Sequence, residues 1–180
     1  MILMSEILFQ KLIELCKKSK NEVSGVLQAK LNDDKIYISD VTFDSSSLIK
    51  DCSPRHITYK NDEYIVKTIY DMTFGNSPVY IQFHTHPGIL DAPKLSEADL
   101  NNLKYIQALA QRVKKIKKLK AILVIEAIVT SNEIAFYTFN PNTNKLIRLP
   151  FYVNGIEQIP STEKTAFQLF KDGFKRGFKK

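Results

Sequence analysis

Two of the three histidines in this chain, His84 and His86, stand two residues apart in the segment His84-Thr85-His86-Pro87. Residues 79–83, which precede them, have the composition of a β-strand. Because residues i and i+2 of a strand point to the same face, the two imidazoles can converge on one point. Imidazole nitrogens are common ligands of zinc. The spacing therefore predicts a metal site at the end of a strand.

A carboxylate for the same site is present at Asp99, near the start of the next expected helix. Two imidazole nitrogens and one carboxylate oxygen, with a fourth position left for water, form the ligand set of a catalytic zinc site. The stretch Ser96-Glu97-Ala98-Asp99 has a second interpretation, because Ser-x-x-Asp is close to a helix capping box. In that arrangement Ser96 caps the helix and no metal is needed. We expect the two roles to compete for the Asp99 carboxylate.

The composition is that of an ordinary globular protein. Hydrophobic residues make up 44% and charged residues 25% of the 180 residues, which fits one domain with a substantial core. No apolar run of ~18 residues predicts a transmembrane helix, and the N-terminus lacks the pattern of a secretory signal. The two cysteines, Cys16 and Cys52, form no CxxC pair. We therefore expect a cytoplasmic protein with reduced thiols.

The chain carries a net charge of +7, from 26 basic and 19 acidic residues. Much of the positive charge lies in residues 112–120 and at the C-terminus. Such a charge favours an acidic partner, for example nucleic acid or an anionic membrane surface. A solvated helix face also explains a run of lysines. Charge alone therefore does not identify a partner.

The hydrophobic pattern predicts one α/β domain over residues 1–160, with a single mixed sheet and helices on both faces. Residues 161–180 are expected to form a basic, phenylalanine-rich helix or tail, which packs on the domain or contacts a partner or membrane. We expect helices at 5–19, from 61 or 62 to about 72, at 97–117 and at 162–176, strands at 23–31, 35–43, 56–59, 79–84, 121–125, 134–139 and 146–153, and a polar loop at 44–55.

Taken together, these motifs resemble the signature of the JAMM (also called MPN) metalloproteases. That signature is a glutamate on an early strand, then His-x-His-Pro, then Ser-x-x-Asp. Here Glu22-Val23-Ser24-Gly25-Val26-Leu27 is similar to the family's Glu-x-x-Gly-x-Leu stretch, and both later motifs follow in the same order. The nine residues from Pro87 to Leu95 depart from the seven that the family usually has there. Because loops tolerate insertions, this departure concerns the substrate more than the metal.

The resemblance implies a fold related to that of cytidine deaminases, and Zn²⁺ held by His84, His86 and Asp99. It implies that Glu22 acts as general base and that Ser96 donates a hydrogen bond to the developing oxyanion. From the residues alone, Glu22 could be a surface residue at the start of a strand. The implied reaction is hydrolysis of a peptide or isopeptide bond, on a ubiquitin-like or small carrier protein, as in a deubiquitinase.

Non-peptidase functions that use the same fold are the alternative. Some relatives of the family lack metal ligands and serve as scaffolds, and a RadC-like branch with a similar motif is linked to DNA repair. The complete ligand set argues against the scaffold, and the chain has no recognisable groove-reading motif for nucleic acid. Residues 44–60 correspond to the place where ubiquitin-cleaving relatives carry a substrate-gripping insertion. Within that segment, His56 is expected to be structural.

Overall fold

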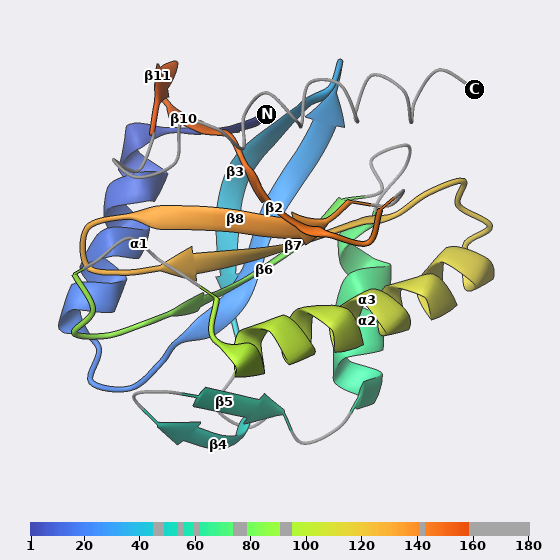
Figure 1. Cartoon of the computed structure of the whole chain (residues 1–180), viewed down its shortest axis with the longest axis horizontal. Helices are drawn as coiled ribbons and strands as arrows, with labels where there is room; N and C mark the ends of the chain where they lie inside the picture. The colour runs from blue at the N-terminus through green and yellow to red at the C-terminus, as the bar shows by residue number, and fades with distance from the viewer. Residues whose placement is uncertain are drawn as a thin grey trace.

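The computed structural model describes residues 1–44, 49–53, 56–59, 62–73, 79–90, 95–140 and 143–158. Within them, a nine-stranded mixed sheet, a two-stranded sheet and three helices form the domain (Figure 1). The predicted mixed α/β class is confirmed. The expected final helix and the rest of residues 161–180 lie outside the described residues, as do the side chains of residues 45–61, His56 included. None of the described helices has the length and hydrophobicity needed to span a bilayer.

The helices are α1 (Glu6–Lys18), α2 (Asp62–Met72) and α3 (Glu97–Ile116). The strands are β1 (Ile2–Met4), β2 (Ser24–Asn32), β3 (Lys35–Phe43), β4 (Ile49–Ser53), β5 (His56–Tyr59), β6 (Val79–Thr85), β7 (Leu123–Val129), β8 (Ile134–Phe139), β9 (Leu146–Leu149), β10 (Phe151–Val153) and β11 (Ile156–Glu157). The large sheet has the order β11-β10-β1-β3-β2-β6-β7-β8-β9, and β4 pairs with β5 alone. Its central strands are therefore β2, β6 and β7.

Most of the expected elements are present within a few residues of their predicted bounds, but four differ. One is β11, which the sequence does not predict because it has only two residues. The hydrophobic pattern does not predict β1, because three residues are too few to show a period. The predicted loop at 44–55 contains β4, a polar segment that becomes a strand by pairing with β5. The single strand predicted at 146–153 is divided at Pro150, whose ring nitrogen has no hydrogen to donate to a neighbouring strand.

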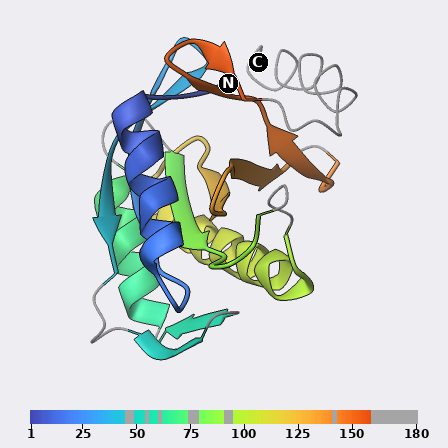
Figure 2. The ribbon, with the colours of Figure 1, turned by 90° about the vertical axis from the view of Figure 1, so that its left-hand side faces the viewer.

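Pro150 separates two strands that lie far apart in the strand order. β9 pairs with β8 at one edge of the sheet, whereas β10 pairs with β1 near the other edge. Since one residue joins β9 to β10, the sheet curls until its two edges approach each other (Figure 2). Phe151 of β10 packs across this junction on Phe136 of β8, with ring centroids 5.0 Å apart. The curl is therefore closed by hydrophobic contact as well as by chain connection.

Alternate side chains of the central strands enter two separate hydrophobic clusters. Ile81 and Phe83 of β6 pack in a cluster with α1, whereas Tyr80 packs in a second cluster with α2 and α3. Because alternate residues of a strand point to opposite faces, the two clusters lie on opposite sides of these strands. His84 shares its face with Tyr80. It is therefore directed to the side of the sheet on which α3 lies.

Gly25 lies at a crowded point of β2, where Phe43 of β3 and Phe83 of β6 are its register partners. The rings of the two phenylalanines meet edge to face across it, with centroids 6.1 Å apart. A Cβ atom at Gly25 would lie 2.7 Å from a ring carbon of Phe83, and closer still to the backbone oxygen of Thr42. Glycine is therefore required for the close packing of these strands.

Replacement of Gly25 by alanine should lower the free energy of unfolding by about 2–3 kcal/mol, because the added methyl group overpacks the sheet. Urea unfolding followed by circular dichroism measures this loss. Gly155→Ala is a matched control, since Gly155 has a positive φ of 83° but open space around it. Backbone strain alone should cost that variant about 1 kcal/mol. Equal losses in the two variants would contradict the packing explanation.

Candidate metal centre

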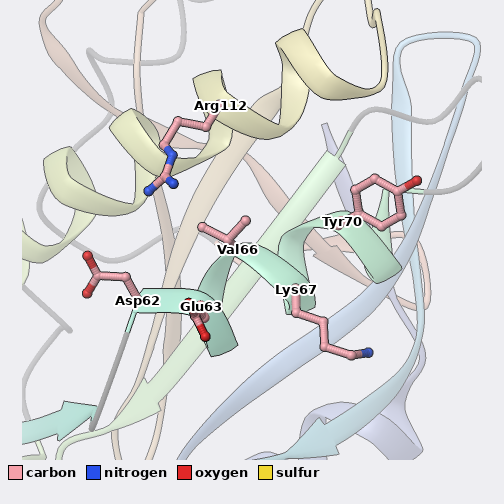
Figure 3. A pocket seen from close by; sticks show the side chains of 6 residues that line it. All are labelled: Asp62, Glu63, Val66, Lys67, Tyr70 and Arg112. Atoms are coloured by element: carbon pink, nitrogen blue, oxygen red, sulfur yellow. The ribbon is translucent and has the colours of Figure 1, made fainter.

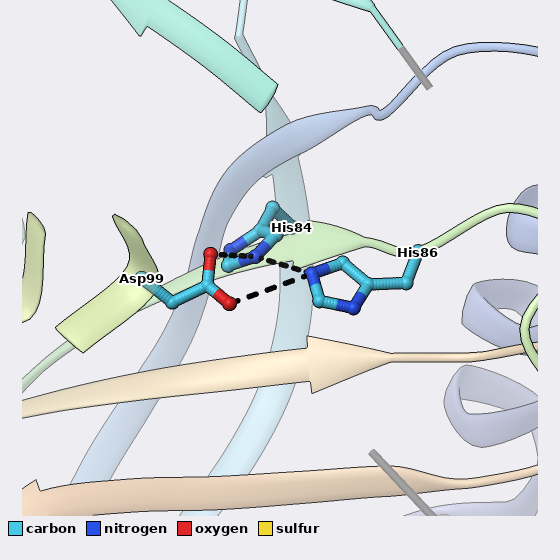
Figure 4. A group of neighbouring side chains, drawn as sticks. All are labelled: His84, His86 and Asp99. Atoms are coloured by element: carbon cyan, nitrogen blue, oxygen red, sulfur yellow. Dashed lines mark hydrogen bonds and ion pairs between the residues drawn. The ribbon is translucent and has the colours of Figure 1, made fainter. Parts of the chain in front are cut away.

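His84, His86 and Asp99 lie together where β6 ends and α3 begins (Figure 4). The Nε2 atoms of the two histidines are 3.0 Å apart. Asp99 Oδ1 lies 3.0 Å from Nε2 of His84, and Asp99 Oδ2 lies 3.7 Å from Nε2 of His86. The three residues that the sequence predicts as metal ligands are thus brought together, each with a donor atom directed at the others.

These separations are those of donor atoms around one small metal ion. In a tetrahedral zinc site with bonds of ~2.0–2.1 Å, neighbouring donor atoms lie about 3.3 Å apart. Nε2 of His84 lies 3.0 Å from both Nε2 of His86 and Oδ1 of Asp99, which is close to that value, and the 3.7 Å contact of His86 is with the second Asp99 oxygen. The donor types, two imidazole nitrogens and one carboxylate oxygen, are also those of zinc sites. The residues therefore fit the implied metal in both distance and chemistry.

The first turn of α3 also forms a complete capping box that uses Asp99. Ser96 Oγ accepts a hydrogen bond from Asp99 N at 3.2 Å, and Asp99 Oδ2 accepts one from Ser96 N at 2.7 Å. The other oxygen, Oδ1, is the one that faces His84. The capping box and the approach to His84 therefore occur together, and competition between capping and metal binding stays a prediction. Oδ2 closes the helix end, while Oδ1 faces His84.

Glu22 is held beside the histidines by backbone pairing at the residue that follows it. Thr85 N donates to Val23 O, and Val23 N donates to Thr85 Oγ1, both at 2.9 Å. Glu22 is only 6% exposed, and its Oε1 lies 3.8 Å from His86 Nε2. The alternative interpretation of Glu22 as a surface residue is therefore wrong. This side chain belongs to the same buried group as the metal-ligand candidates.

Ser96 occupies the N-cap of α3 and is exposed to solvent. Its hydroxyl oxygen accepts the hydrogen bond of the capping box. A hydroxyl that accepts a hydrogen bond can still donate its own hydrogen. Capping is therefore compatible with the donor role that the sequence resemblance implies for this residue.

Glu126 is a candidate functional residue that the sequence analysis did not identify. It is fully buried in β7, and its Oε1 lies 2.7 Å from Nδ1 of His84. A signal for it was present, because Glu126 is the one charged residue in the otherwise apolar strand β7. Acidic side chains are almost never fully buried unless they are paired. Here the partner is the ring nitrogen on the opposite side of His84 from Asp99.

The two carboxylates control the ionisation of His84. Burial lowers the pKa of His84, but its hydrogen bonds with Asp99 and Glu126 outweigh burial and raise the pKa to about 10. Burial raises the pKa of Asp99, but the hydrogen bond and charge of His84, together with the hydrogen bonds of Ser96, outweigh burial and lower the pKa to about 2. Burial lowers the pKa of His86 and raises the pKa of Glu126. Without a metal, His84 therefore holds a proton between the two carboxylates.

A pocket lined by residues of α2 and α3 shares no residue with this cluster (Figure 3). Its volume is about 230 Å³, and it has acidic, basic and apolar lining groups. The lining residues are Asp62, Glu63, Val66, Lys67, Tyr70 and Arg112. Because its charges have both signs and none belongs to the metal-ligand candidates, the pocket indicates no particular class of ligand.

Comparison with known proteins identifies a similar fold. No family model matches the chain, and no curated protein matches it. Among solved structures, it is similar to the solution structure of protein DSY2949 from Desulfitobacterium hafniense, with a TM-score of 0.51. The two chains are 15% identical, and the similarity covers 85% of this chain and 92% of that one. At this level of identity the similarity concerns the fold alone.

The two roles of Asp99 can be separated by mutation. Ser96→Ala removes the hydroxyl acceptor, so the free energy of unfolding should fall by about 1 kcal/mol. The backbone of residue 96 still donates to Asp99 in this variant, and zinc binding should persist. Asp99→Ala should lose zinc as well as stability. The zinc content after dialysis measures metal binding, and the midpoint of urea unfolding measures stability. Equal zinc loss in the two variants would contradict the assignment of the Asp99 carboxylate as ligand.

Metal binding should displace the proton that His84 holds. Zinc affinity should therefore rise as pH rises toward the His84 pKa of about 10, by about tenfold per pH unit if one proton leaves per ion. Competition with a chromogenic chelator between about pH 6.5 and pH 8.5, corrected for protonation of the chelator, measures this slope. An affinity that does not change with pH would show that no proton is displaced.

Proposed function

We propose that this chain is a zinc-dependent metallopeptidase that hydrolyses a peptide or isopeptide bond. The proposed substrate class is a ubiquitin-like or small carrier protein, as for the JAMM metalloproteases that the sequence resembles. The observation that carries the proposal is the convergence of Glu22, His84, His86 and Asp99 on one buried cluster. The placement of α1 with one hydrophobic cluster, and of α2 and α3 with the other, is further support for a related fold.

Zinc is the metal that this donor set favours. Imidazole nitrogens suit transition metals such as zinc, whereas calcium and magnesium prefer several oxygen ligands. Three protein ligands would leave one coordination position open, which distinguishes catalytic zinc sites from structural ones. When bound, zinc would supply a Lewis acid that polarises the substrate carbonyl and makes water more acidic.

Glu22 is the proposed general base. Its Oε1 is 3.8 Å from Nε2 of His86, which is beyond hydrogen-bond length but close enough to share a water molecule with the ligand atoms. The two hydrogen bonds between Val23 and Thr85, one of them to the threonine hydroxyl, fix the point from which this side chain extends. Glu22 would take a proton from the attacking water and deliver it to the leaving amine.

Ser96 is the proposed donor to the developing oxyanion. It lies at the N-terminus of α3, where unpaired backbone N–H groups and the helix dipole favour negative charge. Its hydroxyl is exposed, so a substrate carbonyl can reach it. A hydrogen bond that forms as the carbonyl oxygen gains charge stabilises the transition state more than the ground state.

The proposed compartment is the cytoplasm. Cys16 is a buried free thiol, which is the state expected in a reducing environment. The proposed partners are the protein substrate alone. The alternative is that the basic residues at the end of α3 contact an anionic surface. Salt-dependent DNA binding without cleavage of any protein substrate would favour this alternative.

Substitution of Glu22 by glutamine should separate catalysis from metal binding. The variant should keep one zinc per chain but lose about 10²–10⁴-fold in turnover, because the amide cannot accept the proton. His84→Ala should lose the zinc itself. Mass-spectrometric metal analysis and chelator-sensitive cleavage of a panel of ubiquitin-like fusions measure both properties.

Glu14→Gln is the matched control, since Glu14 is an exposed glutamate paired with Lys18 on α1. It should retain both zinc and turnover. A parent protein that binds no zinc, or that cleaves nothing in the panel and binds DNA instead, would reject the peptidase. Equal turnover in the Glu22→Gln variant and the parent would reject Glu22 as base.

A further inference from the structure

Glu126 is more deeply buried than acidic side chains usually are in proteins. Its side chain has no solvent exposure, and Ile125 and Ala127, its chain neighbours, are fully buried as well. Oε1 contacts His84 Nδ1, while Oε2 is buried without a hydrogen-bond partner among the described residues. A buried polar atom without a partner costs folding free energy, and an apolar side chain of similar size would avoid that cost. This cost in folding free energy indicates that Glu126 has a role in the candidate metal site.

The contact with Glu126 determines which nitrogen of His84 is free. An ionised carboxylate accepts hydrogen bonds, so the 2.7 Å contact favours a hydrogen on Nδ1 of His84. In a neutral ring, Nε2 then carries the lone pair. Nε2 is the atom that lies 3.0 Å from both Asp99 and His86. The buried glutamate thus selects the tautomer that directs a lone pair at the candidate metal position.

The charges of the site lead to the same conclusion. A divalent cation, two neutral imidazoles and the Asp99 carboxylate together carry one net positive charge, and the carboxylates of Glu22 and Glu126 both lie near it. Glu126 supplies one negative charge on the far side of the His84 ring, where it cannot touch the ion but remains close to it. In a medium of low dielectric constant such a charge is screened weakly. Its position therefore favours occupation of the site by a divalent cation.

We propose that Glu126 is a positioning residue of the metal centre, which acts through His84 to orient the ligand nitrogen and to strengthen binding of a divalent cation. This inference rests on the proposed metal site. Carboxylates that bind the second nitrogen of a metal-ligating histidine typically change metal affinity by about 10–100-fold. In the metal-free protein the same contact helps to raise the pKa of His84, so removal of Glu126 leaves a buried imidazole that has lost one of its partners.

The test compares Glu126→Leu and Glu126→Gln with the parent protein. Leucine removes both the acceptor and the charge, and zinc affinity should fall by about 100-fold. Glutamine keeps an acceptor oxygen in nearly the same shape, so the loss should be about tenfold. Competition with a chelator measures the affinities at one fixed pH. The visible spectrum of the Co²⁺-substituted protein should shift in the leucine variant, because the His84 ring is no longer held in place.

Thr138→Val is the matched control. It removes a buried 2.7 Å hydrogen bond from Thr138 Oγ1 of β8 to Val124 O of β7, the strand that carries Glu126, but away from the histidines. This variant should lose stability and keep the zinc affinity of the parent. If the Glu126→Leu protein fails to fold, the isosteric glutamine variant decides the question by its affinity.

The outcomes separate this inference from the proposed function. Affinities in both Glu126 variants within threefold of the parent would overturn the role of Glu126 and leave the metal site intact. Equal affinity loss in Glu126→Leu and Thr138→Val would also overturn it, because general loosening of the strands would then explain the effect. A parent protein that binds no zinc would overturn the metal site itself.

Discussion

The imidazole of His84 lies between two carboxylates, and the rest of the site depends on that placement. Asp99 contacts Nε2 from the start of α3, and Glu126 contacts Nδ1 from the adjacent strand β7. For both contacts, His84 must lie on a central strand. A neighbouring strand must carry an acidic residue, and a helix must begin over the same face of the sheet. The order β2-β6-β7 and the packing of α3 on these strands satisfy both requirements.

Local signals in the sequence were sufficient to locate the metal-ligand candidates. The His-x-His spacing at a strand end and the Ser-x-x-Asp start of α3 each depend on a few consecutive residues, and both features are present. Non-local pairing was not predictable in the same way. Glu126 is 42 residues from His84, and only the parallel register of β6 and β7 places its side chain on that ring. The division of a strand at Pro150 and the pairing of β1 have the same non-local origin.

Asp99 shows why two interpretations of one motif need not exclude each other. The sequence suggests either a capping box or a metal ligand, and the structure contains the capping box and the ligand geometry together. A carboxylate has two oxygens in fixed relative positions, so a bond to one of them orients the other. The stability of the first turn of α3 is therefore linked to the geometry of the metal-ligand candidates. Helix fraying at this end would move the ligand away from both histidines.

The junction at Pro150 has a consequence for how the domain is made. Ile2 of β1 is the register partner of Phe151 of β10, so the N-terminal strand completes its pairing only with residues near the end of the described chain. During synthesis on the ribosome, α1 and the first hairpin emerge early, yet the curled sheet cannot close until Phe151 has left the exit tunnel. Nascent chains that stop before this residue keep an open sheet edge and an uncovered apolar surface, which favours aggregation or chaperone binding.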